Sequence, residues 1–425
     1  MLTDTVAKKL ALVQSECQST GALPCENEEV THDEVRHVLN HETLQLIDRL
    51  EQEDAVANLV RTVSLLRAEG HPAERVHHAL EQVRLRRKAT SKLGPFAHSM
   101  LFTEEGLQQA TRLDVAAHHA GRFRDAGLTR VADLGCGLGV DALALSAVDR
   151  QVIAVERDPA TAALATFNLA SFPNTSVVCA DATSFALDDV DAVWLDPARR
   201  EGVKRLSDPA HWSPSLTDTF SILRRIPGGA KLAPGIDRDL LPADMEWQWV
   251  SAHGDVVEVV VWSGALRRPG IGRSALVLTP EGAHEMVAES DSPDQAPGDI
   301  GKYVYEPDGA VIRARLIGNL ARELDGHMID PQIAYITSDT LKQTAFADAF
   351  AVHEVVALKE DVLKKIVRER RVGDLEIKVR GVDRDPATLR KALKPQGTEK
   401  LTLLLTRRGT SAIAIVASRI ETAPA

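Results

Sequence analysis

The sequence predicts an α/β fold built on a parallel sheet, with a helical region before it and a smaller α/β module after it. Residues 131–200 alternate short apolar runs with helical runs at the spacing of βαβ units, which implies parallel strands. Four apolar runs lead into an acidic residue: Asp133, Glu156, Asp181 and Asp196. Right-handed crossovers bring the carboxyl ends of such strands to one edge of the sheet, where ligands bind. We therefore expect the four acids to face one pocket.

A glycine-rich turn follows the first strand. It places Gly135, Gly137 and Gly139 before a helical run. Glycine suits a turn in which the backbone approaches a ligand or takes a positive φ. The N-terminus of the next helix offers free N–H groups and a partial positive charge, which suits a nucleotide-like ligand. The glycines alone leave NAD open, because Gly137, Gly139 and Ala142 loosely match the dinucleotide fingerprint.

The acids favour S-adenosylmethionine (SAM) over NAD. A carboxylate at Asp133 can attract the ammonium of a methionine group, whereas it would repel a pyrophosphate. Glu156 can accept hydrogen bonds from both ribose hydroxyls, a feature that NAD proteins share. Asp181 can accept a hydrogen bond from an adenine amino group. The three acids together predict a pocket for an adenosyl-sulfonium ligand.

These motifs, in this order, resemble a class I SAM-dependent methyltransferase over roughly residues 100–265. The segment 133–139 resembles its glycine motif, and the segment 196–199 resembles its fourth, catalytic motif. The resemblance implies a Rossmann-like, seven-stranded sheet and SAM as cofactor. It also implies that the residues around these motifs bind SAM: Asp133, Gly135, Gly137, Gly139, Glu156, Arg157, Asp181 and Ala182.

The fourth motif departs from the family pattern. Related enzymes commonly have Asp/Asn-Pro-Pro-aromatic, in which the carboxylate or amide and a carbonyl accept both N–H bonds of an exocyclic base nitrogen. Asp196 and Pro197 match this pattern, whereas Ala198 and Arg199 replace the second proline and the aromatic residue. Arginine can stack on a base or bind a phosphate. It can also bind an anionic small molecule, or simply be solvated in a loop.

The composition bounds the other properties of the chain. Its 425 residues allow two or three domains, and its net charge of −11 argues against an evenly basic coat for nucleic acid. No run approaches the roughly 20 apolar residues of a membrane span, and the start of the sequence lacks a signal-peptide pattern. The four cysteines form no C-x-x-C pair, so we expect the protein to be in a reduced cytoplasm. From these observations together we expect no membrane partner and no metal site.

Residues 1–94 are expected to form a helical domain. Residues 1–74 are acidic, with six Lys/Arg against fourteen Asp/Glu. His37 and His41 are spaced i, i+4, but without a matching acid or cysteine set we interpret them as residues of a solvated helix face. The segment 75–93 is a basic helix, which forms either a solvated face or a phosphate-contacting edge: Arg75, Arg84, Arg86, Arg87, Lys88 and Lys92.

The segment 96–122 leads into the predicted sheet. It resembles the aromatic–hydroxyl segment and helix that lie over the cofactor in methyltransferases acting on RNA caps and bases. Phe102 and Gln109 are therefore candidate contacts of cofactor or substrate. The alternative is a core phenylalanine and an exposed amide. The methyltransferase domain is expected to span residues 95–270.

Near the end of that domain, residues 228–233 are interpreted as a turn into strand five. The runs 247–250 and 256–262 are interpreted as an antiparallel pair, which resembles the terminal hairpin of this family. Residues 280–300 are rich in acids, Ser, Pro and Gly, which predicts a loop or linker.

Residues 271–425 are expected to form a C-terminal α/β domain. Strand-like runs at 375–379, 401–406 and 411–417 flank a helix from Pro386 to Leu393. From residue 356 onward there are sixteen Lys/Arg against nine Asp/Glu. This module is similar to the THUMP-like domain of some bacterial methyltransferases. The resemblance implies RNA as a partner; the alternative is a solvated basic surface on a structural domain.

Three functions remain open at this stage. The leading one is a SAM-dependent RNA methyltransferase whose C-terminal module docks RNA. A small-molecule methyltransferase with structural extra domains is the first alternative. A SAM-binding scaffold without turnover is the second, because the fourth motif is altered. No sequence feature specifies an oligomeric state.

Overall fold

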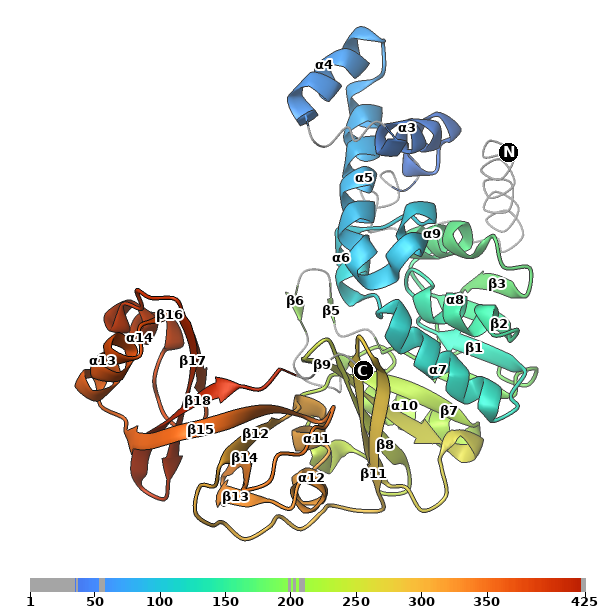
Figure 1. The fold of residues 1–425 in the computed structure, drawn as a ribbon. Coiled ribbons are helices and arrows are strands. Elements are labelled where there is room, and N and C mark those ends of the chain that lie inside the picture. The colour runs from blue at the N-terminus through green and yellow to red at the C-terminus, as the bar shows by residue number, and fades with distance from the viewer. Residues whose placement is uncertain are drawn as a thin grey trace. The chain divides into compact units, whose positions relative to one another are not determined.

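The computed structural model describes residues 35, 37–52, 58–197 and 211–421, and the backbone alone of the short strands β5 (Arg200–Glu201) and β6 (Lys204–Arg205) (Figure 1). Helices and strands alternate through the middle of the chain, and two large sheets follow from their pairing. None of the helices among the described residues combines the length and apolar content needed to cross a bilayer.

The described residues of the segment 35–99 are mainly helical, as the sequence predicts for this part of the chain. This segment comprises α3 (His41–Gln52), α4 (Leu59–Ala68) and α5 (Ala73–Leu93), followed by the 3₁₀ helix η2 (Gly94–Ser99). Apolar residues three and four positions apart, such as Leu44, Ile47 and Leu50 on α3, are buried. His37 stacks on His78 with ring centroids 5.6 Å apart, and His41 contacts Gln45, its neighbour one turn along the helix. No cluster of three metal-ligating side chains occurs among the described residues.

Many of the basic residues of α5 bind acids and carbonyl groups of the chain itself. Arg86 is only 2% exposed and donates to Glu51 at 2.9 Å and to the carbonyl of Met100 at 2.9 Å. Arg84 pairs with Glu104 at 3.0 Å. Lys88, Lys92 and Arg75 also have partners within the described chain. These contacts tie α5 to the segment that follows it, so this helix has fewer cations available for phosphate than its sequence suggests.

The larger sheet has nine strands in the order β11-β10-β8-β9-β7-β4-β1-β2-β3. Seven of them, from β8 to β3, follow the predicted methyltransferase arrangement, and β10 and β11 extend the sheet. The pairs β1–β2, β1–β4, β2–β3 and β4–β7 are parallel. The strands are β1 (Arg130–Leu134), β2 (Gln151–Glu156), β3 (Thr175–Cys179), β4 (Ala192–Leu195), β7 (Gly228–Leu232), β8 (Glu246–Ala252), β9 (Asp255–Ser263), β10 (Arg273–Thr279) and β11 (Gly282–Ala288).

The strands of this sheet are linked mainly by helices. These are α6 (Glu104–Gln109), α7 (Leu113–Asp125), α8 (Val140–Ala147), α9 (Pro159–Leu169) and α10 (Leu216–Arg225), with the 3₁₀ turns η4 (Arg238–Leu240) and η5 (Gly264–Leu266). Strand β4 is buried at all four positions, and β7 at all five, as expected for central parallel strands covered on both faces.

The expected linker at 280–300 is partly wrong. Strand β11 occupies Gly282–Ala288 and pairs antiparallel with β10 through the tight turn at Pro280 and Glu281. Its side chains are mostly exposed, with Met286 buried. An edge strand of this kind needs few apolar residues, so its composition resembles that of a loop. The sheet thus continues past residue 270, where the sequence predicts the methyltransferase domain to end.

The second sheet has seven strands in the order β13-β14-β12-β15-β18-β17-β16. The predicted strands at 375–379, 401–406 and 411–417 and the predicted helix are confirmed. Helices α13 and α14 pack on β16, β17 and β18 through the cluster of Leu363, Leu389 and Leu403. The elements are β12 (Tyr303–Pro307), α11 (Gly309–Arg313), α12 (Ile317–Glu323), β13 (His327–Asp330), β14 (Ile333–Ser338), β15 (Ala347–Ala357), α13 (Glu360–Glu369), β16 (Val372–Val379), α14 (Pro386–Leu393), β17 (Glu399–Arg408) and β18 (Ser411–Arg419).

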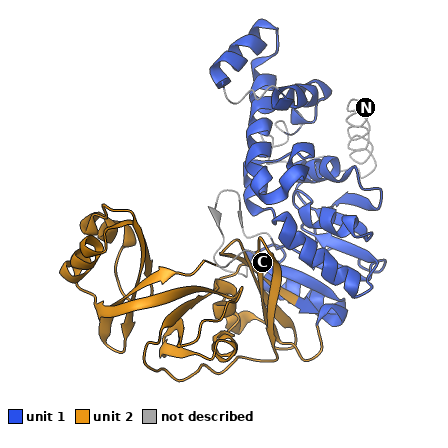
Figure 2. Ribbon diagram, in the orientation of Figure 1, with its two compact units in different colours: residues 1–232, 262–267 blue, residues 233–261, 268–425 orange. Residues whose placement is uncertain are grey.

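The chain divides into two compact units (Figure 2). Unit 1 contains residues 1–232 and 262–267, and unit 2 contains residues 233–261 and 268–425. The strand-end acids of β1, β2, β3 and β4 all belong to unit 1.

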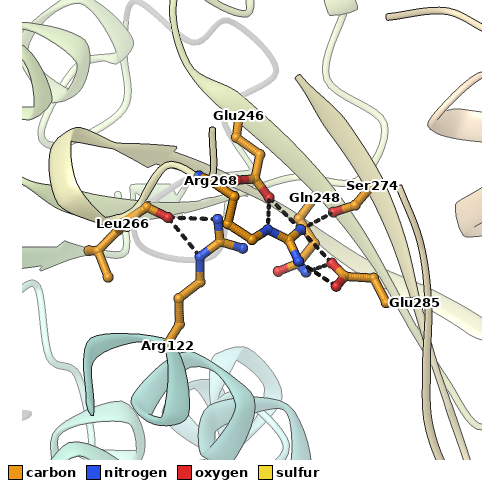
Figure 3. A network of polar contacts seen from close by, with 7 residues as sticks. All are labelled: Arg122, Glu246, Gln248, Leu266, Arg268, Ser274 and Glu285. Atoms are coloured by element: carbon orange, nitrogen blue, oxygen red, sulfur yellow. Dashed lines mark hydrogen bonds and ion pairs between the residues drawn. The ribbon is translucent and has the colours of Figure 1, made fainter. Parts of the chain in front are cut away.

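A buried ion-pair network joins β8, β10 and β11 within unit 2 (Figure 3). Arg268 donates to Glu246, whose side chain is 0% exposed, at 2.6 Å and to Glu285 at 2.5 Å. Burial would raise the pKa of Glu285, but the hydrogen bonds from Arg268 outweigh burial and lower it. Gln248 and Ser274 complete the network. Figure 3 also shows Arg122 of unit 1, which donates to the carbonyl of Leu266 at 2.9 Å.

Replacing Arg268 by methionine should destabilise this hairpin region by about 3–5 kcal/mol, because a fully buried carboxylate loses its partner. Urea unfolding followed by tryptophan fluorescence measures the change. The double variant R268M/E246M removes the fully buried carboxylate as well and should recover part of the loss, because only the less buried Glu285 then lacks its ion-pair partner. A change below about 1 kcal/mol in the free energy of unfolding of R268M would contradict a stabilising role for Arg268 as the partner of buried Glu246.

Candidate active site

The glycine turn lies between β1 and α8 and requires glycine at two positions. Gly135 has φ 88°, and a Cβ there would lie 3.0 Å from the backbone oxygen of Asp196. Gly139 has φ 86°, and a Cβ would lie 2.9 Å from the side chain of Leu169. The N–H of Gly135 also donates to the carbonyl of Val155 in β2 at 2.9 Å. The turn is therefore packed closely against β2 and the start of the fourth motif.

Glu156 at the end of β2 holds the glycine turn from the other side. Its carboxylate accepts hydrogen bonds from the N–H of Gly137 at 3.1 Å and of Asp158 at 3.0 Å. Burial raises the pKa of this carboxyl, although the backbone N–H groups oppose the shift. The adjacent Arg157 is exposed and donates to Ser213 at 3.0 Å. A half-buried carboxylate next to a glycine turn fits a ligand with a vicinal diol.

Asp181 and Ala182 follow β3. Asp181 is exposed and accepts hydrogen bonds from the N–H of Thr183 at 2.7 Å and from its hydroxyl at 2.5 Å. The hydroxyl contact is the main cause of the lowered pKa of this carboxyl. Asp181 is therefore an ionised acceptor with surface open to a ligand.

Asp133 at the end of β1 is 1% exposed, and neither carboxylate oxygen has a hydrogen-bond partner among the residues that the structure describes. Burial raises the pKa of this carboxyl well above its usual range, and the nearby carboxylates of Asp141 and Asp196 raise it further. Buried carboxylates are normally paired or hydrogen-bonded. The charge of Lys231 and the backbone of Ala142 lower the pKa of Asp133 only in part, so a cationic ligand group at this edge would stabilise its ionised form further.

Asp196 and Pro197 follow β4. The N–H of Asp196 donates to the carbonyl of Leu134 at 3.3 Å, and Pro197 is buried. The carboxylate of Asp196, 27% exposed, forms an ion pair with Lys231. Arg199 lies outside the described residues.

Lys231 and three neighbours form part of the site that sequence reasoning missed. Lys231 lies on β7 and is 8% exposed; its ammonium also donates to Thr111 at 2.9 Å. Thr111 donates to Asp141 at 2.6 Å, and Asp141 contacts His119 at 2.9 Å. The one available signal was a lysine inside the otherwise apolar and glycine-rich strand Gly228–Leu232.

The two candidate contacts before the sheet differ in exposure. Phe102 is 1% exposed, and its backbone N–H and carbonyl both bind the amide of Gln82, at 3.0 and 2.7 Å. Its ring thus has almost no surface for a ligand, which favours the core alternative. Gln109 is exposed at the end of α6.

Two protein families match this chain. Residues 347–419 match the family described as THUMP domain-like, and residues 31–89 match the Domain of unknown function (DUF8688). The THUMP-like match covers the elements from β15 to β18.

Relatives of known name match most of the chain. Two Mycobacterium tuberculosis proteins, each named as an uncharacterised S-adenosylmethionine-dependent methyltransferase, are 32% identical over 355 residues, which is 82% of this chain and 97% of each relative. A crystal structure of a protein named as a methyltransferase from Porphyromonas gingivalis has a TM-score of 0.65 and 23% identity, and the match covers 83% of this chain and 92% of that one. The glycine turn, the buried Asp133 and this relationship agree: the chain belongs to the S-adenosylmethionine-dependent methyltransferases and uses SAM as its cofactor.

Proposed function

We propose that this enzyme methylates a nucleotide in RNA, and that its THUMP-like C-terminal domain docks the RNA. The observation that carries the proposal is a set of exposed cations on that domain. Seven cations on or beside its two helices α13 and α14 form no ion pair within the part of the chain that the structure describes, and we call them the basic helical surface: Lys359, Arg368, Arg371, Arg384, Arg390, Lys391 and Lys394.

The basic helical surface lies on α13, α14 and their flanking turns. The buried sides of these helices face the sheet through residues such as Leu363 and Leu389, so the charged residues are turned toward solvent. The acids nearby are largely engaged: Glu360 pairs with Lys364, and Asp385 caps α14. Cations that have no acid of their own are suited to the phosphate backbone of a nucleic acid.

We assign SAM binding to the residues at the carboxyl edge of the larger sheet. Glu156 would accept the ribose hydroxyls and Asp181 the adenine amino group, and Asp133 would balance positive charge on the methionine part. Arg157 and Ala182 lie next to these acids. The glycine turn would let the backbone approach the ligand: Gly135, Gly137 and Gly139.

Replacing Glu156 by glutamine should weaken SAM binding roughly 10- to 100-fold, since a hydrogen bond to a charged acceptor contributes about 1.5–3 kcal/mol. Isothermal titration calorimetry with SAM measures this affinity. Asp149→Asn is a matched control, because Asp149 is exposed in the turn before β2, at the opposite edge of the sheet. If E156Q and the wild type bound SAM with equal affinity, Glu156 would not be the residue that binds the ribose.

We assign acceptor binding to Asp196 and Pro197, with an exocyclic base nitrogen as the acceptor. When bound, SAM supplies an electrophilic methyl group. The carboxylate and the carbonyl of Pro197 accept the N–H bonds of the base and so orient its lone pair. As the new N–C bond forms and the C–S bond breaks, Asp196 takes the proton that the nitrogen loses. Arg199 is proposed to stack on the base or to bind a phosphate.

We propose three domains: a helical domain at 1–94, a methyltransferase domain that begins at residue 95 and continues past the expected end at 270 through β11, and a THUMP-like domain after it. The helical domain supports the fold and takes no part in the chemistry.

The test is to incubate the enzyme with methyl-labelled SAM and total RNA, total DNA or a metabolite extract. Label in RNA, abolished by ribonuclease treatment, supports the proposal. Label only in the metabolite pool would establish a small-molecule methyltransferase instead. SAM binding without label in any pool would establish a scaffold.

A further inference from the structure

A buried polar chain lies behind Asp196, and the chemistry proposed above does not yet use it. Lys231 pairs with Asp196 and donates to the hydroxyl of Thr111. That hydroxyl donates to one oxygen of Asp141, whose other oxygen contacts Nδ1 of His119. All five residues belong to unit 1, and they join β4 and β7 to α7, α8 and the segment before α7.

The hydrogen bonds that link these side chains have a defined direction. An ionised carboxylate only accepts, so the single hydroxyl hydrogen of Thr111 goes to Asp141. The hydroxyl oxygen then accepts from Lys231, whose ammonium is donor-only. Lys231 is thus held at two points, by Thr111 and by Asp196, and its side chain is too buried to move freely. This fixes the position of the charge that faces Asp196.

Carboxylates near Lys231 favour a cation there, and the charges of Asp141 and Asp196 also raise the pKa of Asp133. The opposing charge is Lys92, whose pKa is lowered to about 8 by burial and by the charges of Arg112, Lys231 and Lys88. Lys231 opposes the rise in the pKa of Asp133 and helps to lower that of Asp141. For Asp141, burial would raise the pKa, but the hydrogen bond and charge of His119 outweigh it. Lys231 is in direct contact with Asp196.

We propose that Lys231 is a positioning residue that holds the carboxylate of Asp196 ionised and in one orientation toward the acceptor. The inference rests on the proposed role of Asp196. An ionised carboxylate can accept hydrogen bonds through both oxygens and can take the proton of the methyl acceptor, whereas a protonated one keeps fewer acceptor sites and cannot take the proton. A fixed ammonium nearby favours the ionised form and restricts the rotation of the side chain.

The kinetic test compares Lys231→Met with Lys231→Arg. K231M should lower kcat about 10- to 100-fold with SAM affinity within threefold, and the acid limb of the kcat/KM profile should move to higher pH. K231R retains the charge and should keep the wild-type profile. In an Asp196→Asn background, K231M should change the rate less than threefold, because the two residues act as one unit. The inference would be overturned if the rate losses of K231M and D196N multiplied in the double variant, or if the pH profile of K231M were unchanged.

A second measurement does not depend on the acceptor. The full chain is labelled with ¹³C at its aspartate carboxyl groups, and the signal missing in D196N is assigned to Asp196. Its titration midpoint should rise by at least one pH unit in K231M, or in K231Q if K231M does not fold. An unmoved midpoint rejects the inference even if the enzyme methylates RNA. A moved midpoint without methyl transfer to RNA supports Lys231 and rejects the proposed acceptor.

Discussion

Replacing Asp196 by asparagine should lower the rate of methyl transfer by about 10²–10⁴-fold, the usual contribution of a positioned general base. The amide keeps the size of the side chain and, like the asparagine of some related enzymes, can still accept an N–H bond, but it cannot take a proton. It also removes the carboxylate that Lys231 contacts directly. SAM affinity should stay within about threefold, because the proposed SAM contacts of Glu156 and Asp181 are on other strands. Transfer of labelled methyl groups and titration with SAM measure the two effects separately.

Asp189→Asn is the matched control for this variant. It makes the same chemical change three residues before β4, at an exposed position at the other end of the strand. Exposed substitutions of this kind usually change stability by less than about 0.5 kcal/mol, and transfer should be unaffected. If D196N retained more than a third of the wild-type rate, Asp196 would not be the general base. Another group would then have to take the proton in the SAM-dependent reaction.

The sheet and its acidic edge could be predicted because both depend on local patterns. Apolar runs of strand length alternate with helical runs, and each acid lies at or just after the carboxyl end of its strand, as Asp133 does in β1 and Glu156 in β2. Strand β11 could not be predicted in this way. It lies at the edge of the sheet, where Met286 is its one fully buried apolar side chain, so the run lacks the alternation that marks a half-buried strand.

The partners of charged residues were not predictable, because pairing depends on the tertiary fold. Lys231 meets Asp196 only because β7 lies beside β4, an adjacency set by the strand order. Arg86 appeared to be one more cation of a basic helix, yet it is buried against Glu51. In both cases the sequence shows the charge but not whether another charge already satisfies it. That distinction separates the cations of α5 from those of the basic helical surface.

Removing four cations of the basic helical surface should weaken RNA binding on the order of a thousand-fold at about 0.1 M salt. Each neutralised phosphate contributes about 0.7–0.9 to the slope of log K against log salt, so four lost contacts reduce that slope by about 3. The affected cations lie on the solvent side of α13 and α14 and before α14, so the fold should be unchanged. Filter binding of the full chain to total RNA across a salt series measures affinity and slope together. The variant carries glutamine at Arg368, Arg384, Arg390 and Lys391.

A second variant tests whether RNA binding depends on the basic helical surface or only on the net charge of the protein. It carries glutamine at four cations of the same domain that lie outside the surface, so the net charge of the two variants is equal: Lys302, Arg313, Lys342 and Lys400. If RNA binds at the basic helical surface, the control should lose less than about tenfold in affinity and keep most of its salt slope. Equal losses in both variants would mean that RNA responds to overall charge. SAM affinity should be the same in both variants and in wild type, because neither set of substitutions touches a residue of the sheet edge that bears Glu156 and Asp196.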